Sequence, residues 1–285
     1  MSIAYLNGAY VPLEEARISP LDRGFLFGDG IYEVIPYYDR KPVGFALHMK
    51  RMQDGLAALE IKCEKSIDEW RELLDELISK NEGSNLGVYI QVSRGADTKR
   101  NHAYPENVEP TLFAFTFGIK DPEPVDREKV HAYSVSSTQD LRWKHCNIKS
   151  TSLLGNVLHY QQGHAAGENE ILLYNQNNEL TEGSSCNAFI VKDGKVITPI
   201  QDNQILPGIT RRIVLDSLRA DGSIPVEERT VTMDEVRNAD EVWITSSSKE
   251  ITPVTRLDGK PVGDGKAGPV WEAAFRIYTD HKFDY

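Results

Sequence analysis

The sequence predicts a mixed α/β protein of the α+β class, divided into two domains. With 285 residues, the chain is long enough for two domains or one large domain. A polar segment at residues 118–124, interrupted by prolines, is typical of a linker. Helical and strand patterns occur on both sides of it. We therefore expect a small N-terminal α/β domain, residues 1–119, and a larger C-terminal domain, residues 120–285.

The first half predicts an antiparallel sheet. Residues 3–12 alternate weakly, and Asn7-Gly8 in their middle favours a hairpin turn. Runs rich in β-branched and aromatic residues predict strands at residues 31–38, 86–93 and 111–118. Pro36 lacks a backbone N–H and favours an edge position or a bulge. A long polar loop, residues 95–110, joins the last two strands, and loops of this length are often functional.

Two helices are expected to pack on this sheet. The first carries Met52, Leu56 and Leu59 on one face. The second begins at Ser66, which with Glu69 forms a capping-box pattern. Its apolar stripe is expected at Ile67, Trp70, Leu73, Leu74, Leu77 and Ile78. An antiparallel sheet covered by helices fits this order of elements.

The second half also mixes strands and helices. Residues 188–199 predict a hairpin with Asp193-Gly194 at its turn. Further strands are expected at residues 129–137, 170–175 and 240–248. Helices are expected at residues 150–167, 209–220 and 269–280. The first of these helices would carry the apolar residues Leu153, Leu154, Val157 and Leu158.

Composition and charge argue against several classes of function. The formal net charge of −11 disfavours nonspecific binding to nucleic acids or anionic membranes. The first residues lack the pattern of a signal peptide, and no run is long and apolar enough to span a membrane. Cys63, Cys146 and Cys186 are odd in number and lack metal-ligand spacing. We therefore expect reduced thiols in the cytoplasm and no metal site.

Two segments carry residues suited to one kind of chemistry. Lys149 lies in residues 146–150, between an apolar residue and a run of small or apolar ones, and Glu182 lies on a Gly/Ser turn in residues 181–187. A lysine in a dry, electropositive pocket forms a Schiff base with a carbonyl. A buried carboxylate keeps a pyridinium nitrogen protonated. This pair suits pyridoxal phosphate, although a single lysine is more often a solvated surface residue.

Several motifs along the chain carry a resemblance to a known family. In order they are DRGFLFGDGIYEVI, NIKSTSLLGNVL, TEGSSCNAF, LPGITR and TSSSKEITPV. With them the chain resembles the pyridoxal-phosphate aminotransferases of fold type IV, and among these the D-amino-acid transaminases. The match covers nearly the whole chain. It implies a two-domain fold with a β-barrel-like C-terminal domain, and a homodimer.

The resemblance also assigns roles at the cofactor. Lys149 would hold pyridoxal 5′-phosphate covalently and move a proton to and from the substrate α-carbon, while Glu182 would face the ring nitrogen. The phosphate would be held by Arg51, Ile209, Thr210, Ser246 and Ser247. A helix beginning after Gly208 suits a phosphate because its first amides lack partners. The alternative interpretation is that Arg51 is a surface arginine, that Gly208 and Thr210 only begin a helix, and that the two serines are loop residues without a ligand.

The resemblance assigns Tyr32, Arg100 and His102 to the substrate carboxylate. In the family the Arg-x-His pair reaches the site from the neighbouring subunit, so the protein would have to dimerise to work. The alternative interpretation is that Tyr32 packs in a core and that the loop charges are solvated. The implied substrates are D-amino acids such as D-alanine or D-glutamate, with pyruvate or 2-oxoglutarate as the 2-oxo acid acceptor.

Other functions within the same fold stay open. Branched-chain L-amino-acid aminotransferases are one, and some of them carry a tyrosine where this chain has Leu154. Aminodeoxychorismate lyase and R-selective amine transaminases are others, although Arg100 and His102 argue against an amine that has no carboxylate. Pro36 stands where several D-amino-acid transaminases have a lysine. A non-catalytic protein that binds pyridoxal phosphate is the remaining alternative.

Overall fold

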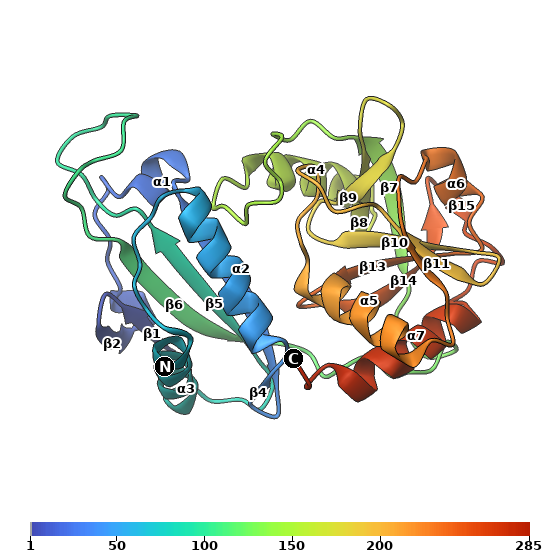
Figure 1. Cartoon of the computed structure of the whole chain (residues 1–285), viewed down its shortest axis with the longest axis horizontal. Coiled ribbons are helices and arrows are strands. Elements are labelled where there is room, and N and C mark those ends of the chain that lie inside the picture. Colours follow the sequence, from blue (N-terminus) through green and yellow to red (C-terminus); the bar gives the residue numbers. More distant parts are fainter. Residues whose placement is uncertain (1) are drawn as a thin grey trace. The chain divides into compact units, whose positions relative to one another are not determined.

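The computed structural model describes residues 2–285, which form two compact units (Figure 1). The first unit runs to Asp121 and also includes Ile148–Leu153 and Tyr285. The second comprises Pro122–Asn147 and Leu154–Asp284. The chain thus passes from one unit to the other within the predicted linker. The segment around Lys149, placed by sequence in the C-terminal domain, makes its contacts with the first unit.

The first unit contains a six-stranded antiparallel sheet in the order β2-β1-β6-β5-β3-β4. Asn7 and Gly8 both have positive φ and close the predicted hairpin. Because only the two-residue β4 pairs with the outer side of β3, Pro36 lies close to an edge, as predicted. The strands are β1 (Ile3–Leu6), β2 (Ala9–Pro12), β3 (Gly30–Tyr38), β4 (Lys41–Pro42), β5 (Leu86–Ser93) and β6 (Thr111–Gly118).

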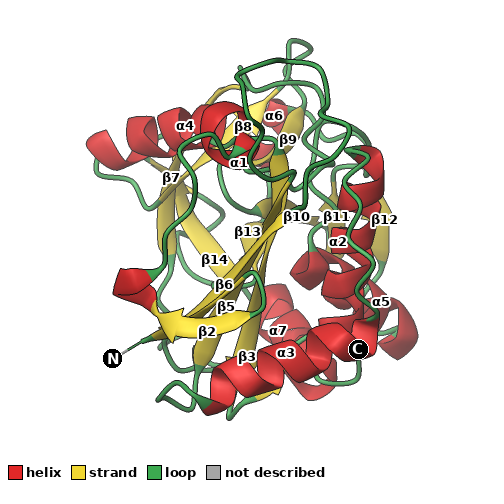
Figure 2. Ribbon diagram, turned by 90° about the vertical axis from the view of Figure 1, so that its left-hand side faces the viewer, coloured by secondary structure: helices red, strands yellow, loops and turns green. Residues whose placement is uncertain are grey.

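The helices of this unit are α1 (Arg23–Phe27), α2 (Phe45–Ala58) and α3 (Ile67–Ser79), with a 3-10 turn at Leu13–Glu15. Helices α2 and α3 cover the sheet and share a core with it (Figures 1 and 2). The Ser66 and Glu69 capping box is present at the start of α3. The predicted stripe of α3 is buried except for Ile67, which is 39% exposed. That position was wrong because Ile67 lies in the first turn, ahead of the part of the helix that meets the sheet.

The second unit contains a nine-stranded mixed sheet with the main order β12-β11-β10-β13-β14-β7-β8-β9. Its strands are β7 (Tyr133–Gln139), β8 (Glu170–Tyr174), β9 (Leu180–Gly183), β10 (Asn187–Lys192), β11 (Lys195–Thr198), β12 (Val226–Glu228), β13 (Glu241–Ser246), β14 (Glu250–Leu257) and β15 (Lys260–Pro261). The end strand β9 also lies beside β10, so the sheet curls around a core of its own. This arrangement agrees with the expected α+β class and curled second domain.

The helices of the second unit pack on this sheet, and α5 and α7 lie side by side (Figures 1 and 2). They are α4 (Leu154–Ala165), α5 (Ile209–Asp221), α6 (Met233–Arg237) and α7 (Pro269–His281). Within residues 2–285 no helix has both the length and the apolar character needed to cross a membrane.

Helix α4 begins later than the sequence predicts. Residues 150 and 151 instead join β3 of the first unit: Ser150 forms a bridge with Ile31, and the Thr151 amide donates to Gly30 O at 2.9 Å. Three of its predicted apolar positions are also not in a core, since Leu154, Val157 and Leu158 are 71%, 57% and 63% exposed. These apolar residues of α4 are therefore exposed on the surface of the chain.

Candidate active site

Strand β3 positions Lys149 in the first unit. The Tyr32 amide donates to Lys149 O at 3.0 Å, which attaches the lysine segment to this edge of the sheet. Lys149 Nζ lies 4.1 Å from the centre of the Tyr32 ring. That ring stacks on Tyr89 of β5, with 5.6 Å between centroids. Tyr32 and Lys149, predicted from separate motifs, are thus in direct contact.

Arg51 belongs to a buried ion-pair cluster in the same unit. Its guanidinium donates from Nε and Nη2 to the two carboxylate oxygens of Glu33, each at 2.7 Å. His48 Nδ1 lies 2.7 Å from Glu33 Oε2. Burial alone would raise the pKa of Glu33, but the charges of Arg51 and His48 lower it well below its usual range. Glu33 therefore fixes the guanidinium in one orientation.

The surroundings of His48 connect this cluster to Lys149. Burial lowers the pKa of His48. The charges of Arg51 and Lys149 lower this pKa as well, whereas the charge of Glu33 raises it. Sequence reasoning did not select Glu33 or His48. A signal for Glu33 was present: it lies two residues from both Ile31 and Ile35 on β3 and so shares their face, which points to the core. A carboxylate there requires cationic partners.

Glu182 is buried in the second unit and accepts three hydrogen bonds. Arg142 Nη1 donates to its Oε1 at 2.8 Å, while Asn187 Nδ2 and the Leu206 amide donate to Oε2 at 3.1 and 3.0 Å. Burial raises the pKa of Glu182 to about 7, although the Arg142 charge opposes this shift. Its carboxyl group therefore lacks sufficient positive charge around it.

Asp140 explains that shortage of positive charge. It accepts hydrogen bonds from Arg142 Nε at 3.0 Å and Nη2 at 2.8 Å, so one guanidinium serves two carboxyl groups. When both are ionised, the cluster carries one net negative charge, and a cation beside Glu182 would balance it. Neither Asp140 nor Arg142 was selected from the sequence. They are two residues apart in a polar loop, and that spacing gives no signal of contact with Glu182.

The N-terminus of α5 is packed closely against Asn187 and has no side-chain cap. Gly208 is its N-cap, and no side chain caps this end of the helix. A Cβ on Gly208 would lie 1.9 Å from Asn187 Oδ1, so only glycine fits there. Ile209 and Thr210 form the first buried turn, whose amides lack intrahelical partners. These features suit a phosphate group.

The strand beside this helix end carries an unpaired hydroxyl group. Thr245 lies opposite Asn187 in the register of β10 and β13, so the two side chains share one face of the sheet. Among the buried side chains of residues 2–285, Thr245 Oγ1 is one of the few polar atoms without a hydrogen-bond partner. Ser246 and Ser247 follow it, half-buried at the strand end. A polar ligand would satisfy this group of hydroxyls.

The Gly/Ser turn after Glu182 is tied to the segment after Ser247. Glu170 accepts hydrogen bonds from the Ser184 and Ser185 hydroxyls and from Lys249 Nζ, the last two at 2.7 and 2.9 Å. Lys249 and Glu170 are both buried from solvent to a large extent. Two motifs that are far apart in the sequence are therefore held by one carboxylate.

Arg100 and His102 lie exposed in the loop between β5 and β6 of the first unit. Both flank Phe27 of α1: the Arg100 guanidinium is 5.0 Å from its ring centre, and the His102 ring is 5.3 Å away. In the part of the chain that is described, no hydrogen bond or ring contact joins either residue to Tyr32. The structure of one chain therefore does not assemble the three residues predicted for the substrate carboxylate.

The predicted residues divide between the units, and each group fits a part of pyridoxal phosphate. The first unit holds Tyr32, Arg51, Arg100, His102 and Lys149, and the second holds Glu182, Ile209, Thr210, Ser246 and Ser247. An amine, a carboxyl group in need of a cation and a helix end suited to phosphate are the donor set that this cofactor requires.

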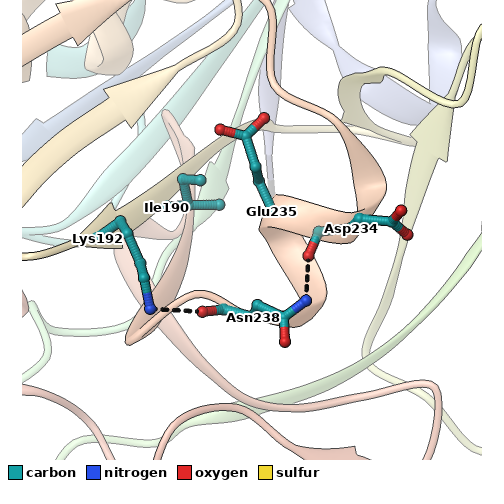
Figure 3. A pocket seen from close by; sticks show the side chains of 5 residues that line it. All are labelled: Ile190, Lys192, Asp234, Glu235 and Asn238. Carbon is teal, nitrogen blue, oxygen red and sulfur yellow. Dashed lines mark hydrogen bonds between the residues drawn. The ribbon is translucent and has the colours of Figure 1, made fainter.

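A surface pocket of about 260 Å³ lies apart from these residues in the second unit, between β10 and α6 (Figure 3). It is lined by Ile190, Lys192, Asp234, Glu235 and Asn238. Lys192 Nζ donates to Asn238 O at 3.0 Å, and Asn238 Nδ2 donates to Asp234 O at 2.8 Å. Because these polar groups already bond to one another, we assign no ligand to this pocket.

Comparison with known sequences gives matches over nearly the whole chain. The family described as Amino-transferase class IV matches residues 30–257. A D-alanine aminotransferase of Staphylococcus aureus (strain MW2) is 40% identical over 272 residues, which cover 95% of this chain and 94% of the relative. The D-alanine aminotransferase of Listeria monocytogenes serotype 1/2a (strain 10403S) is 38% identical over 275 residues, covering 96% and 94%.

Solved structures share the fold at lower identity. The branched-chain amino acid aminotransferase of Escherichia coli has a TM-score of 0.89 and 25% identity, covering 98% of this chain and 94% of that one. The branched-chain aminotransferase of the thermophilic archaeon Thermoproteus uzoniensis, solved with norvaline, has a TM-score of 0.86 and 21% identity, covering 100% and 96%. Both structures therefore share the fold of this chain over nearly its whole length.

Proposed function

Because this chain belongs to the class IV aminotransferases, we propose that it transfers the amino group of D-amino acids to 2-oxo acids with pyridoxal phosphate as cofactor. The observation that carries the proposal is the likeness to D-alanine aminotransferases, at 40% identity over 95% of the chain. The branched-chain enzyme of Escherichia coli matches in fold but at 25% identity. The enzyme is an aminotransferase, and the handedness of its substrate is the point to test.

Lys149 and Glu182 would carry the chemistry. When bound, the cofactor supplies an electron-withdrawing pyridinium ring that stabilises negative charge at the substrate α-carbon. Glu182 would keep that ring protonated, since its carboxyl group has only a share of the Arg142 charge. Lys149 would hold the cofactor covalently and, once released from it, take the proton from the α-carbon through its Nζ atom.

Groups from distant parts of the sequence would hold the phosphate. Arg51 offers a planar guanidinium whose orientation is fixed by Glu33. The first amides of α5 at Ile209 and Thr210 offer donors at the positive end of a helix. Hydroxyl groups at Ser246 and Ser247 complete the proposed set. Each of these groups stabilises negative charge without needing to titrate near neutral pH.

Substrate handedness would follow from a fixed carboxylate. Lys149 can reach only one face of the bound substrate, so the α-hydrogen must point to that face. If Tyr32, Arg100 and His102 hold the carboxylate, only one enantiomer satisfies both conditions. The preferred test measures transamination of D- and L-alanine with 2-oxoglutarate. We expect the wild type to prefer D-alanine. Arg100→Ala should lower kcat/KM for D-alanine roughly tenfold to a hundredfold.

A different outcome of this assay would select the second candidate function. The likeness in fold to branched-chain aminotransferases favours that candidate. A preference for L-leucine or L-valine, unchanged by Arg100→Ala, would place the protein in that group. His102→Ala should act in the same direction as Arg100→Ala but less, because a histidine is only partly charged near neutral pH.

We also propose that the protein works as a homodimer in the cytoplasm. Large apolar side chains are exposed on α4 and the loop before it: Leu141, Trp143, Leu154, Val157, Leu158 and Tyr160. Monomeric proteins rarely expose such a group together. The three cysteines are free, which suits a reducing compartment.

Light scattering tests the dimer. Val157→Glu with Leu158→Glu should shift the mass from two chains to one and lower D-alanine turnover, because a charge on an apolar interface costs several kcal/mol unless it is paired. Ile200→Glu, at a residue 53% exposed outside α4, is the matched control and should leave the mass unchanged. A wild-type protein that scatters as a single chain at micromolar concentration would refute the proposed dimer.

A further inference from the structure

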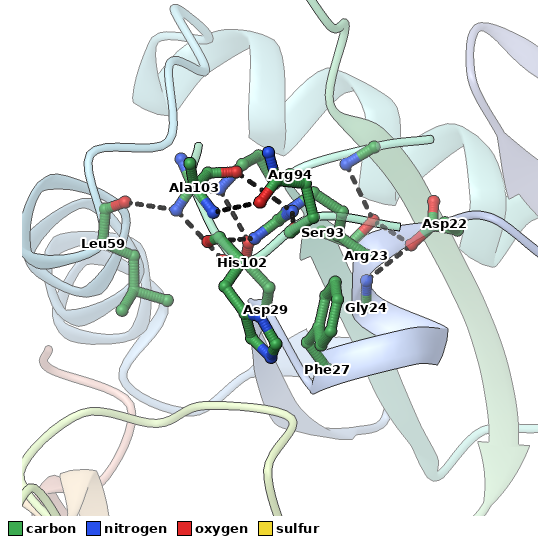
Figure 4. A network of polar contacts seen from close by, with 12 residues as sticks. Asp22, Arg23, Gly24, Phe27, Asp29, Leu59, Ser93, Arg94, His102 and Ala103 are labelled. Carbon is green, nitrogen blue, oxygen red and sulfur yellow. Dashed lines mark hydrogen bonds and ion pairs between the residues drawn. The ribbon is translucent and has the colours of Figure 1, made fainter. Parts of the chain in front are cut away.

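The loop that carries Arg100 and His102 is attached to a buried arginine of α1 (Figure 4). Arg23 is only 3% exposed, and its guanidinium donates to the backbone carbonyls of three consecutive residues, Asn101, His102 and Ala103. These are backbone acceptors, so the contact fixes the path of the chain rather than one side chain. A buried guanidinium therefore holds the centre of an exposed loop.

Asp29 orients Arg23 and joins it to a second arginine. Asp29 Oδ2 accepts from Arg23 Nε at 2.7 Å and from Arg94 Nε at 2.8 Å, and Oδ1 accepts from Arg94 Nη2 at 3.0 Å. Burial disfavours the charged form, but hydrogen bonds from Arg94 and Arg23 still lower the pKa of Asp29. The Arg94 guanidinium also covers Tyr104, 3.5 Å from its ring centre. The carboxylate thus supports both arginines that contact the loop.

Phe27 contacts the side chains that the loop presents. Its ring is approached by the Arg23 guanidinium at 4.8 Å, by that of Arg100 at 5.0 Å and by the His102 ring at 5.3 Å. Arginine over an aromatic ring is attractive, and more so where water is excluded. Helix α1 therefore contacts the loop in two ways. Arg23 binds the backbone of the loop, and Phe27 contacts the side chains of Arg100 and His102.

The base of the loop is closed by a second carboxylate. Asp22 accepts from the Ser93 hydroxyl at 2.7 Å and from the Thr111 hydroxyl at 2.6 Å, one at each strand end that the loop joins. Gly95 has φ of 99°, and a Cβ there would lie 2.0 Å from Glu109 O. Only glycine allows the two arms to meet this closely.

Residues 28–32, which follow α1, contact the segment that carries Lys149. The Ser152 hydroxyl donates to Gly28 O at 3.1 Å, just after α1, and the Tyr32 amide donates to Lys149 O at 3.0 Å. Residues 22–32 thus contact both the loop and the lysine segment. We therefore expect a change in Arg23 to act on the loop and to leave the contacts of the lysine segment with Gly28 and Tyr32 in place.

We propose that Arg23, oriented by Asp29, is a positioning residue that holds Arg100 and His102 in the conformation that binds the substrate carboxylate. This inference rests on the proposed function. Ordering a loop of this length costs conformational entropy, and the contacts of Arg23 offset part of that cost before the substrate arrives. When the loop samples other conformations, the apparent affinity falls by the fraction that remains competent. The effect is expected in KM more than in kcat.

The variant that tests this is Arg23→Lys, which keeps the charge and loses the planar fork that reaches three carbonyls. We expect KM for D-alanine to rise roughly tenfold with kcat changed less than about twofold. In an Arg100→Ala/His102→Ala background the same substitution should leave KM unchanged, because nothing remains to be positioned. Equal losses in both backgrounds, or a wild-type KM in Arg23→Lys, would overturn the proposal.

Arg40→Lys is the matched control. Arg40 also donates to two backbone carbonyls of the first unit, those of Ile78 and Asn81, at 3.0 and 2.9 Å, but it lies away from the loop. Because Arg40 is exposed, Arg40→Lys should lower Tm less than Arg23→Lys does, and it should leave KM as in the wild type. A rise in KM in Arg40→Lys equal to that of Arg23→Lys would mean that general destabilisation explains both.

A readout that does not use turnover separates this inference from the proposed function. Trypsin cuts after Lys99 and Arg100, and the ordered loop should resist it. Arg23→Lys should be cut there roughly tenfold faster, and Arg40→Lys at the wild-type rate. An enzyme with no D-alanine activity but this pattern of cleavage would refute the proposed function and keep the anchor. Equal cleavage of all three proteins would refute the anchor.

Discussion

Glu33 and Glu182 are buried carboxyl groups, one in each unit, and their surroundings shift their pKa values in opposite directions. Glu33 is contacted by two basic side chains, Arg51 and His48. Glu182 shares one guanidinium with Asp140. The difference shows what each carboxyl group is suited to do: the first is saturated and holds a guanidinium in place, and the second can accept another cation. Burial alone would not separate these two roles.

Removal of Lys149 should have the largest effect, because it takes away the amine that would hold the cofactor covalently. Lys149→Ala should lower D-alanine turnover below detection and abolish the visible absorption band of the holoenzyme that borohydride bleaches. Lys144→Ala, at an exposed lysine five residues earlier, is the control and should retain both. Near-normal turnover in Lys149→Ala would contradict the assigned mechanism.

Glu33→Gln should sharpen the comparison through stability. The substitution leaves Arg51 buried without its carboxylate, which is expected to cost about 3–5 kcal/mol of unfolding free energy. Urea unfolding of the cofactor-free protein measures this loss, with Glu76→Gln, at an exposed position of α3, as the control. The affinity for pyridoxal phosphate should fall as well, because the guanidinium loses its fixed orientation. Unchanged stability would mean that Glu33 does not hold Arg51.

Glu182→Gln should show the opposite pattern. It removes the charge that would keep the pyridinium protonated and retains the size of the side chain. We expect turnover to fall by roughly a hundredfold to a thousandfold, with cofactor occupancy reduced far less. Absorbance of the bound cofactor and steady-state rates measure the two quantities on the same sample. Equal losses in both would indicate that Glu182 is structural, as Glu33 is.

The smallest effect is a pH dependence of the cofactor-free protein. The pKa of Glu182 is about 7 in the folded protein and 4.5 ordinarily, so between these values the folded chain binds a proton that the unfolded chain has released. The stabilisation is present below the lower value and is lost as the pH rises through the higher one. Wild type should lose up to about 3 kcal/mol relative to Glu182→Gln across this range, measured by urea unfolding. A loss equal in both proteins would contradict the assigned pKa.

Sequence patterns predicted the strands of the first unit closely, because β-branched and aromatic runs end at clear polar loops, as at residues 86–93 and 111–118. They misplaced the start of α4, since Ser150 and Thr151 join another part of the chain and no local pattern reports this. The motifs supplied Lys149 and Glu182 but not their partners. Arg142 meets Glu182 only in the tertiary structure. Arg23 binds backbone carbonyls, which every residue carries, so no sequence pattern marks its partners.

The excursion of Ile148–Leu153 into the first unit has a consequence for how the protein is made. During translation the first 121 residues leave the ribosome without the segment that pairs with Ile31 and receives the Tyr32 amide. The contacts of β3 with this segment can form only after about thirty more residues have been synthesised, a matter of seconds at ordinary elongation rates. The nascent chain therefore cannot finish one half before starting the other, and a gene cut at residue 121 would encode a fragment with an open edge beside β3.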